Sequence, residues 1–107
     1  MSTTNKVQLT GNLGSNPEIK IFENGNKVAR FSIATKDEYK TKAGEKAEDT
    51  QWHSISAWGK MVEQIETELK KGSLVSVEGR LNTRNYVDKN GVKKYFTEVV
   101  ANEVILK

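Results

Sequence analysis

The two tryptophans of the chain lie in one short stretch, "TQWHSISAWGK" at 50–60. Because side chains alternate between the two faces of a β-strand, a strand here places Trp52 and Trp58 on one face and the apolar Ile55 on the other. Two serines separate the indoles and are small enough to leave both faces of each ring open. Exposed aromatic rings stack on flat ligands, and a nucleobase of any identity contributes about 1–3 kcal/mol in such a stack.

If the other face of this strand packs on the core of a barrel, the face with the two indoles is turned to solvent. It would then expose a large apolar area unless something covers the rings. A neighbouring subunit, a loop folded back over the strand, or a ligand with flat apolar faces could each be the cover. The other aromatics and the cations distinguish these alternatives.

Cations are interleaved with the aromatic residues. Tyr39 and Tyr86 lie outside any buried period, and Lys60 follows Trp58 directly past a glycine. Around Tyr86, one acidic residue, Asp88, accompanies five basic ones: Arg80, Arg84, Lys89, Lys93 and Lys94. Phosphates need neutralising and unstacked bases need a surface, so this combination predicts binding of single-stranded nucleic acid.

Residues for catalysis are few. His53 is the only histidine, there is no cysteine, and Gly11 and Gly14 do not fit a phosphate-binding loop or a dinucleotide fingerprint. We therefore expect a binding protein with no catalytic residue, cofactor or metal site. His53 alternates in phase with Ile55, which favours a partly buried structural residue or a subunit contact.

Strands with alternating apolar residues position these groups. We expect one domain over 1–107, with five strands at 5–14, 27–35, 50–60, 73–81 and 95–106. A glycine bend interrupts the first strand, a short extended piece follows Pro17, and Asn-Gly pairs at 24–25 and 90–91 predict turns. The strand order, with a helix between the third and fourth, indicates an all-β five-stranded Greek-key barrel, the OB-fold.

Two segments have a different pattern. In 60–72, Met61, Ile65 and Leu69 recur at helical spacing, and lysines in the last turn with Gly72 just past it predict a short amphipathic helix. Residues 36–50 have many charges of both signs and no period that buries anything, so we expect a long charged surface loop. No apolar run predicts a signal peptide or membrane span, which leaves the cytosol as the expected compartment.

The chain resembles the bacterial single-stranded DNA-binding proteins, and the resemblance covers nearly its whole length in order. The residues that show it are "NKVQLTGNLGSNPE", "NGNKVARFSIAT", "TQWHSISAWGK", "LKKGSLVSVEGRLNTRNY" and "TEVVANEV". The resemblance implies a bacterial, cytoplasmic, nucleoid-associated OB-fold homotetramer. It would bind single-stranded DNA without sequence preference in replication, recombination and repair, with no catalysis.

The resemblance also implies roles for single residues. The family's stacking aromatics fall on Trp52, Trp58, Tyr39 and Tyr86, and the family has a histidine near the subunit contacts at His53. Its phosphate-contacting residues match four positions: Lys42, Lys60, Lys71 and Arg84.

The sequence departs from the family in two respects. Ser54, Asn82 and Asn85 stand where members often have arginine or lysine, and we expect Arg80 to compensate for Asn82, two residues away on the same strand face. Fewer phosphate contacts predict a shallower salt dependence of affinity. Members usually continue into a flexible tail whose acidic tip recruits genome-maintenance proteins. The sequence given ends at Lys107, so tail-mediated partners are not expected of these residues.

Two alternatives use the same residues. An RNA-binding or primosome-type OB protein would share the basic, aromatic surface. A subunit-interaction module would instead bury the two tryptophans between protomers, and its indole fluorescence would be indifferent to DNA.

Overall fold

The computed structural model describes residues 3–107, and its strands and single helix follow one another along the chain. The helix α1 spans Met61–Glu68 between the fourth and fifth strands. The six strands are β1 (Val7–Leu13), β2 (Glu18–Ile21), β3 (Lys27–Lys40), β4 (Lys46–Trp58), β5 (Leu74–Val87) and β6 (Lys93–Leu106).

Five of these strands close into a barrel, which confirms the predicted OB-fold. They are hydrogen-bonded in the order β1-β5-β6-β4-β3, and β1 also pairs with β3, where Leu13 lies opposite Ile33. The pairing of β4 with β6 is parallel, and all the others are antiparallel. β2, the short extended piece after Pro17, adds an edge strand to β3.

The core consists of the inward-facing residues of these strands, as the alternation predicts. Val28 is also buried, although it precedes the inward Ala29. Where β1 crosses β3, a side chain at Gly11 would collide with the carbonyl oxygen of Ala34. Glycine is therefore required for the barrel to close. The apolar core cluster includes Leu13, Ala29, Phe31, Ile33, Ile55, Ala57, Val62, Ile65, Val75, Val77, Val99 and Ala101.

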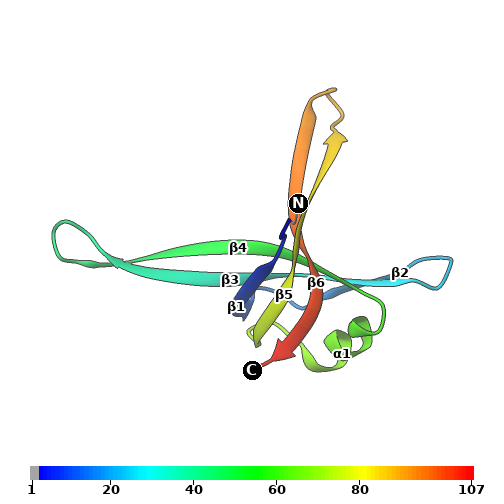
Figure 1. Ribbon diagram of the computed structural model, residues 1–107, viewed down its shortest axis with the longest axis horizontal. Helices are drawn as coiled ribbons and strands as arrows, with labels where there is room; N and C mark the ends of the chain where they lie inside the picture. Colours follow the sequence, from blue (N-terminus) through cyan, green and yellow to red (C-terminus); the bar gives the residue numbers. More distant parts are fainter. Residues whose placement is uncertain (1–2) are drawn as a thin grey trace.

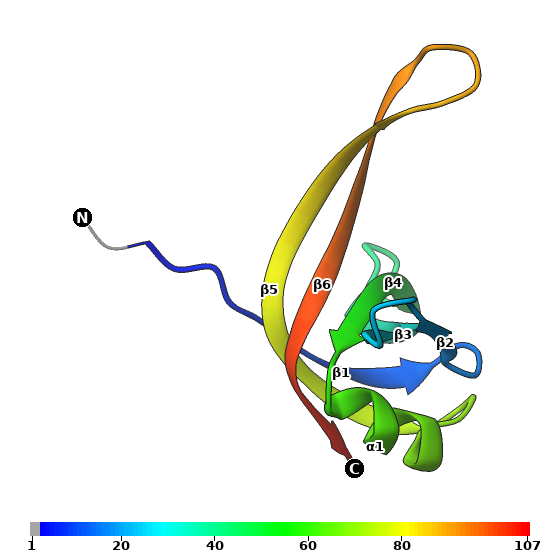
Figure 2. The ribbon, with the colours of Figure 1, turned by 90° about the vertical axis from the view of Figure 1, so that its right-hand side faces the viewer.

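The helix lies across one end of the barrel (Figure 2) and buries Val62 and Ile65. It ends at Glu68, so the prediction that lysines occupy its last turn is wrong. Leu69 is extended, with ψ of 138°, and buries its side chain in the core. Lys70 and Lys71 follow in the loop to β5, where Gly72 donates its backbone N–H to the carbonyl of Leu13.

The prediction of a loop at 36–50 is wrong, because these residues form the outer half of a long β3–β4 hairpin (Figure 1). The ladder continues to Lys40 opposite Lys46, and a tight turn follows in which Gly44, with φ of 80°, donates its N–H to Thr41. This ribbon is held by backbone hydrogen bonds and buries few side chains. The hydrophobic pattern of the sequence therefore could not reveal these two strands. We call the part of the hairpin from 36 to 50 the β3–β4 arm.

A second hairpin leaves the barrel in another direction, formed by β5 and β6 (Figures 1 and 2). A register shift at Glu78 and Gly79 marks its departure, and Leu81, predicted in phase with the core, is half exposed beyond that point. We call the part of this hairpin from 80 to 98 the β5–β6 arm.

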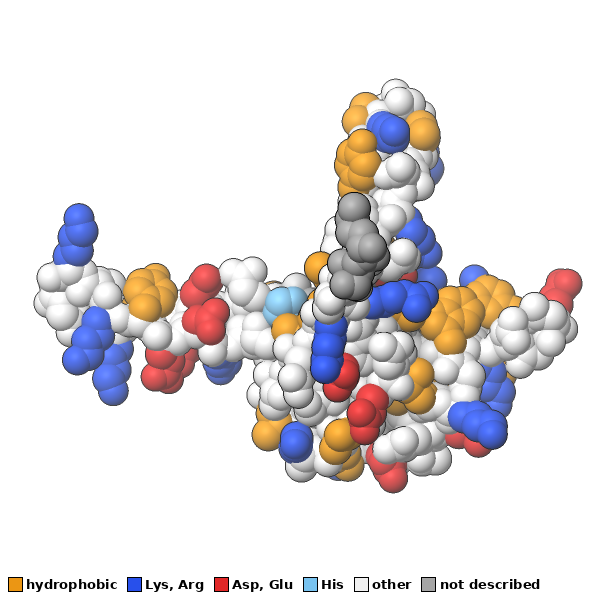
Figure 3. Space-filling model, viewed as in Figure 1, with side chains coloured by type: hydrophobic (Ala, Val, Ile, Leu, Met, Phe, Trp, Pro, Cys, Tyr) orange, Lys and Arg blue, Asp and Glu red, His pale blue; other side chains and the backbone are white. Residues whose placement is uncertain are grey.

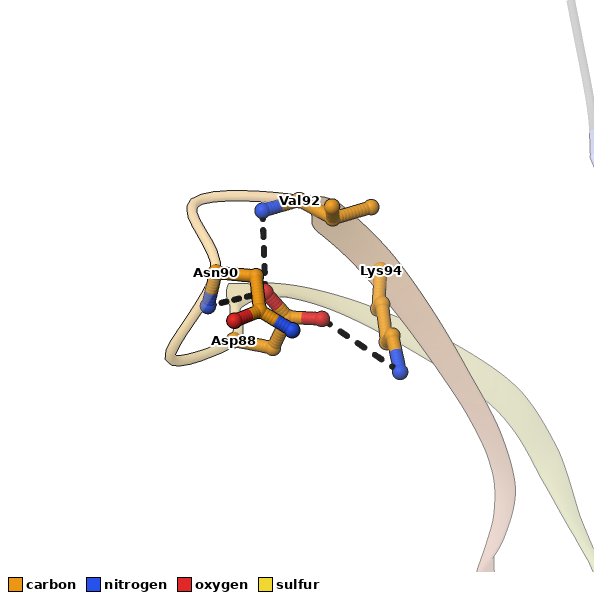
Figure 4. A network of polar contacts seen from close by, with 4 residues as sticks. All are labelled: Asp88, Asn90, Val92 and Lys94. Atoms are coloured by element: carbon orange, nitrogen blue, oxygen red, sulfur yellow. Dashed lines mark hydrogen bonds and ion pairs between the residues drawn. The ribbon is translucent and has the colours of Figure 1, made fainter.

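The carboxylate of Asp88 organises the turn of the β5–β6 arm (Figure 4). Its Oδ1 accepts the backbone N–H groups of Asn90 and Val92, both at 2.9 Å, and its Oδ2 lies 3.4 Å from the Lys94 ammonium. The Val92 hydrogen bond does most to lower the pKa of Asp88; desolvation opposes it, and the hydrogen bonds of Asn90 and Lys94 add to the lowering.

Candidate nucleic-acid interface

The outer side of β4 carries both tryptophans, as the alternation predicted. Trp52 is 61% exposed and Trp58 is 42% exposed, whereas Ile55 and Ala57 between them are buried in the barrel. Ser54 is exposed, but Ser56, which also points outward, is buried, so neighbouring side chains cover β4 at Ser56, between the two indoles. The exposed aromatic surface therefore consists of two separate patches.

Each indole rests against another part of the chain, so the expectation that both its faces are open is wrong. Trp58 stacks on Phe22, with ring centroids 5.7 Å apart and planes 9° from parallel. The six-membered ring of Trp52 lies against Gly14, where an added Cβ would collide with it. These contacts hold the rings in place and leave Trp58 only one face for a ligand.

A cleft of about 530 Å³ adjoins Trp58. Its lining includes Lys60 and Lys27, and the Lys27 ammonium lies 4.0 Å from the carboxylate of Glu63. Such a volume is within the range of small-ligand sites. The cleft thus offers an aromatic face beside a cation that makes no ion pair within residues 3–107, Lys60.

A second region joins Trp52 to the β5–β6 arm through adjoining hollows. One contains Trp52, Ser54 and Glu98, a second also contains Ser54 and Glu98, and Phe96 links the second to a third that contains Arg84 and Tyr86. The structure therefore brings together three of the predicted site residues, Trp52, Arg84 and Tyr86.

Tyr39 and Lys42 are not part of either region. Both lie toward the end of the β3–β4 arm, which projects far from the barrel (Figure 1). Trp52 pairs with Ala34 of β3 and therefore shares its face of the ribbon. Tyr39 is an odd number of residues from Ala34 on the same strand, so Tyr39 and Trp52 lie on opposite faces.

The predicted phosphate-contacting residues differ in their availability. Arg84 Nη2 lies 3.5 Å from the buried carboxylate of Glu98, so it is already paired. Lys71 lies in the loop after α1, where its backbone N–H is donated to Asn16. Four predicted cations are exposed and make no ion pair among residues 3–107: Lys42, Lys60, Lys71 and Arg80.

His53 is half-buried on the inner phase of β4. Its Nε2 lies 2.9 Å from the hydroxyl of Thr35, which excludes neither tautomer. The position fits the structural role predicted for it, and its role at a subunit contact stays a prediction.

Two aromatics of this surface, Phe22 and Phe96, were missed by the sequence reasoning. A signal existed for Phe96, because it alternates in phase with Glu98 and out of phase with the buried Val99. For Phe22 there was none, since it lies just past the end of β2, where its backbone closes the turn to β3 by donating to Asn26 and accepting from Gly25. Phe22 covers one face of Trp58, and the Lys20 ammonium lies 5.1 Å from the centroid of its ring.

Within the part of the chain that the structure describes, no three histidine, aspartate or glutamate side chains gather as metal ligands. The helix found among these residues is too short to cross a membrane.

Comparisons with known proteins agree with this arrangement. The model of the single-strand binding protein family matches residues 4–106. Single-stranded DNA-binding protein 1 of Xylella fastidiosa (strain 9a5c) is 44% identical over 105 residues, which cover 97% of this chain and 77% of that protein. The solved structure of the Plasmodium falciparum SSB complex with ssDNA superposes with a TM-score of 0.92 at 34% identity, covering 100% of this chain and 97% of that one.

Proposed function

Because the chain belongs to the single-strand binding protein family, we propose that it binds and protects single-stranded DNA without sequence preference, in replication, recombination and repair. The observation that carries this proposal is the outer side of β4, where Trp52 and Trp58 are exposed on a barrel whose surface offers unpaired cations. Aromatic faces take bases of any identity, and cations take phosphates, so this surface holds a strand without reading its sequence.

In this proposal the bases stack on four side chains and the phosphates lie on five. Stacking residues are Trp52, Trp58, Tyr39 and Tyr86. Phosphate-contacting residues are Lys42, Lys60, Lys71, Arg80 and Arg84. The protein acts by binding, and added salt reversibly weakens the binding.

We further propose that the chain forms a homotetramer, with His53 near a subunit contact, and that it works on DNA in the bacterial cytoplasm, in association with the nucleoid. Support for an oligomer comes from apolar side chains left exposed at the end of the barrel away from the arms. Leu74, Ile105 and Leu106 are each more than 40% exposed there. Light scattering with size-exclusion chromatography measures the oligomer directly.

Tryptophan fluorescence tests the proposed binding. Oligo-dT added to the purified protein should quench the indole emission strongly, and the quenching should weaken as salt rises, because counterion release drives the phosphate contacts. Absence of quenching at low salt would remove Trp52 and Trp58 from the site. Equal or tighter binding of an RNA homopolymer at matched salt would favour the RNA-binding alternative.

A single substitution separates a DNA contact from a core residue. Trp52→Ala should weaken DNA binding by about 1–3 kcal/mol while the domain stays folded, since its indole is mostly exposed. Circular dichroism checks the fold of the variant. Unfolding of Trp52→Ala would instead assign Trp52 to the core.

A further inference from the structure

Phe96 is an exposed aromatic at the centre of the region between Trp52 and Tyr86. It lies on β6 directly opposite Arg84, and 38% of its surface is exposed. The Cζ atom of Arg84 lies 5.4 Å from the centroid of its ring. The Phe96 side chain thus lies outside the core cluster, and the Arg84 guanidinium covers only part of its ring.

The strand pairing places Phe96 on the same side of the barrel as Trp52. Ser56 and Val100 are partners in the parallel β4–β6 pair. Four residues earlier on each strand are Trp52 and Phe96, which have the same phase as these partners and therefore the same outer side. The alternation that turns Ile55 inward also turns Val99 inward.

Phe96 also connects the hollows of this surface. One hollow, of about 240 Å³, has Phe96 beside Ser54 and Glu98, and the next, of about 430 Å³, has Phe96 beside Tyr86 and Arg84. A strand that passes from Trp52 to Tyr86 along these hollows therefore crosses the Phe96 ring.

The pairing of the cation beside the Phe96 ring, Arg84, favours a base over a phosphate at that position. Glu98 is only 7% exposed, and its Oε1 lies 3.5 Å from Arg84 Nη2. This carboxylate holds the guanidinium near the ring and offsets its charge, so a phosphate gains less attraction here than at an unpaired cation. The planar ring and planar guanidinium remain, and both are surfaces on which bases stack.

We propose that Phe96 is a further base-stacking residue, which takes a base of the strand between Trp52 and Tyr86, and that Glu98 positions Arg84 beside this base, which weakens the phosphate contact proposed for Arg84 above. This inference rests on the proposed binding of single-stranded DNA. It adds a platform on the barrel's outer side that the predicted set of four aromatics does not contain.

A fluorescent reporter at the position tests the contact directly. Phe96→Trp is made in a Trp52→Phe, Trp58→Phe background, so that the new indole is the only tryptophan and the replaced rings keep their stacking faces. Saturating oligo-dT should quench its emission. The matched control is Tyr95→Trp in the same background: Tyr95 is the adjacent residue, is 65% exposed and has Lys93 Nζ 5.8 Å from its ring centroid, but it faces the other side of the ribbon.

The emission of the control should change little. Binding in both reporters is followed independently by the anisotropy of a labelled oligo-dT. A bound complex with an unquenched indole at position 96, or with equal quenching at 95 and 96, would overturn the proposal while leaving DNA binding by the protein intact.

Affinity measurements give a second, independent readout. Phe96→Leu should weaken oligo-dT binding about 5- to 150-fold, which is the fold-change equivalent to 1–3 kcal/mol of stacking, and Phe96→Tyr should retain parental affinity. Tyr95→Leu should stay near the parent. Because no phosphate contact is removed, the slope of log affinity against log salt should not change in Phe96→Leu. Parental affinity of a folded Phe96→Leu protein would refute the stacking role.

Discussion

The two arms are both two-stranded antiparallel ribbons that leave the same barrel, but their cross-strand pairs differ. In the β3–β4 arm, residues of like charge face each other: Asp37 opposite Asp49, Glu38 opposite Glu48 and Lys40 opposite Lys46. The β5–β6 arm instead sets aromatics against polar or cationic partners: Phe96 opposite Arg84, Tyr95 opposite Asn85 and Tyr86 opposite Lys94. Directly opposed like charges destabilise a ribbon, whereas a cation over an aromatic face, as Arg84 is over Phe96, stabilises it.

This difference gives the arms different surfaces. The β3–β4 arm has acidic side chains along its shaft and basic ones at its end, which Figure 3 shows as a red zone followed by a blue one. A polyanion is therefore attracted to the end of that arm and repelled along its shaft. The β5–β6 arm presents stacking rings and cations together. We infer that the two arms have similar geometry but different roles, and that of the two it is the β5–β6 arm that holds bases.

Deleting one aromatic from each arm should give the largest difference between them. Tyr86→Ala should weaken oligo-dT binding by about 1–3 kcal/mol, because Tyr86 adjoins the hollow that also contains Phe96 and Arg84. Tyr39→Ala should cost clearly less, since acidic pairs lie between it and the barrel. Anisotropy titrations at one salt concentration compare the two, and equal losses would show that both arms stack bases alike.

Charge removal should separate the paired cations from the unpaired ones. Arg80→Gln and Lys42→Gln should each lower the slope of log affinity against log salt by about 0.7, the value for one phosphate contact on a single strand. Arg84→Gln should change the slope less, because Glu98 already offsets its charge. A full reduction in Arg84→Gln would mean that DNA displaces Glu98 from the guanidinium.

Much of the barrel could be predicted from the sequence because its strands alternate between a core and an outer side. Val75 and Ile55 were placed correctly by period alone, and the same alternation found Trp52 on the outside. The arms could not be predicted in this way. Asp37 and Glu48 bury nothing, so a paired ribbon and a charged loop have the same pattern, and only the backbone ladder distinguishes them.

The site was predicted residue by residue but not as an arrangement. Alternation shows which side of a strand carries an aromatic, but it does not show what covers the ring. The stack of Phe22 on Trp58 and the contact of Trp52 with Gly14 join residues from separate strands. The pairing of Arg84 with Glu98 likewise depends on which residues of β5 and β6 lie opposite each other. A register shift at Glu78 and Gly79 sets this, and the hydrophobic pattern does not predict that shift.

Replacing one like-charge pair should stabilise the β3–β4 arm. Glu48→Lys sets a lysine opposite Glu38 and should raise the free energy of unfolding by about 0.2–1 kcal/mol at low salt. Thermal denaturation measures the effect. Glu66→Lys on an exposed position of α1 makes the same change in net charge away from the ribbon. A gain equal in both variants, or one that persists in high salt, would exclude the local pair as its cause.

The smallest expected effect is a pH dependence that the turn of the β5–β6 arm has and the turn of the β3–β4 arm lacks. Asp88 closes the β5–β6 turn as a carboxylate, and the N–H groups it accepts lower its pKa in the folded state. Its contribution is therefore fully present above the unfolded pKa of about 3.9, and it is lost as pH falls below that value through the folded one. The amide proton shift of Val92 should follow this titration in NMR spectra.

The β3–β4 turn provides the matched control, because the Glu45 amide there is donated to the hydroxyl of Thr41, which does not titrate. Asp88→Asn keeps an oxygen acceptor but has no charge to lose, so its Val92 shift should stay flat over the same pH range. If the Val92 shift moved equally in Asp88→Asn, the transition would belong to the whole arm and not to this carboxylate. A midpoint above 3.9 would reverse the sign and mean that burial, rather than the hydrogen bonds of the turn, governs Asp88.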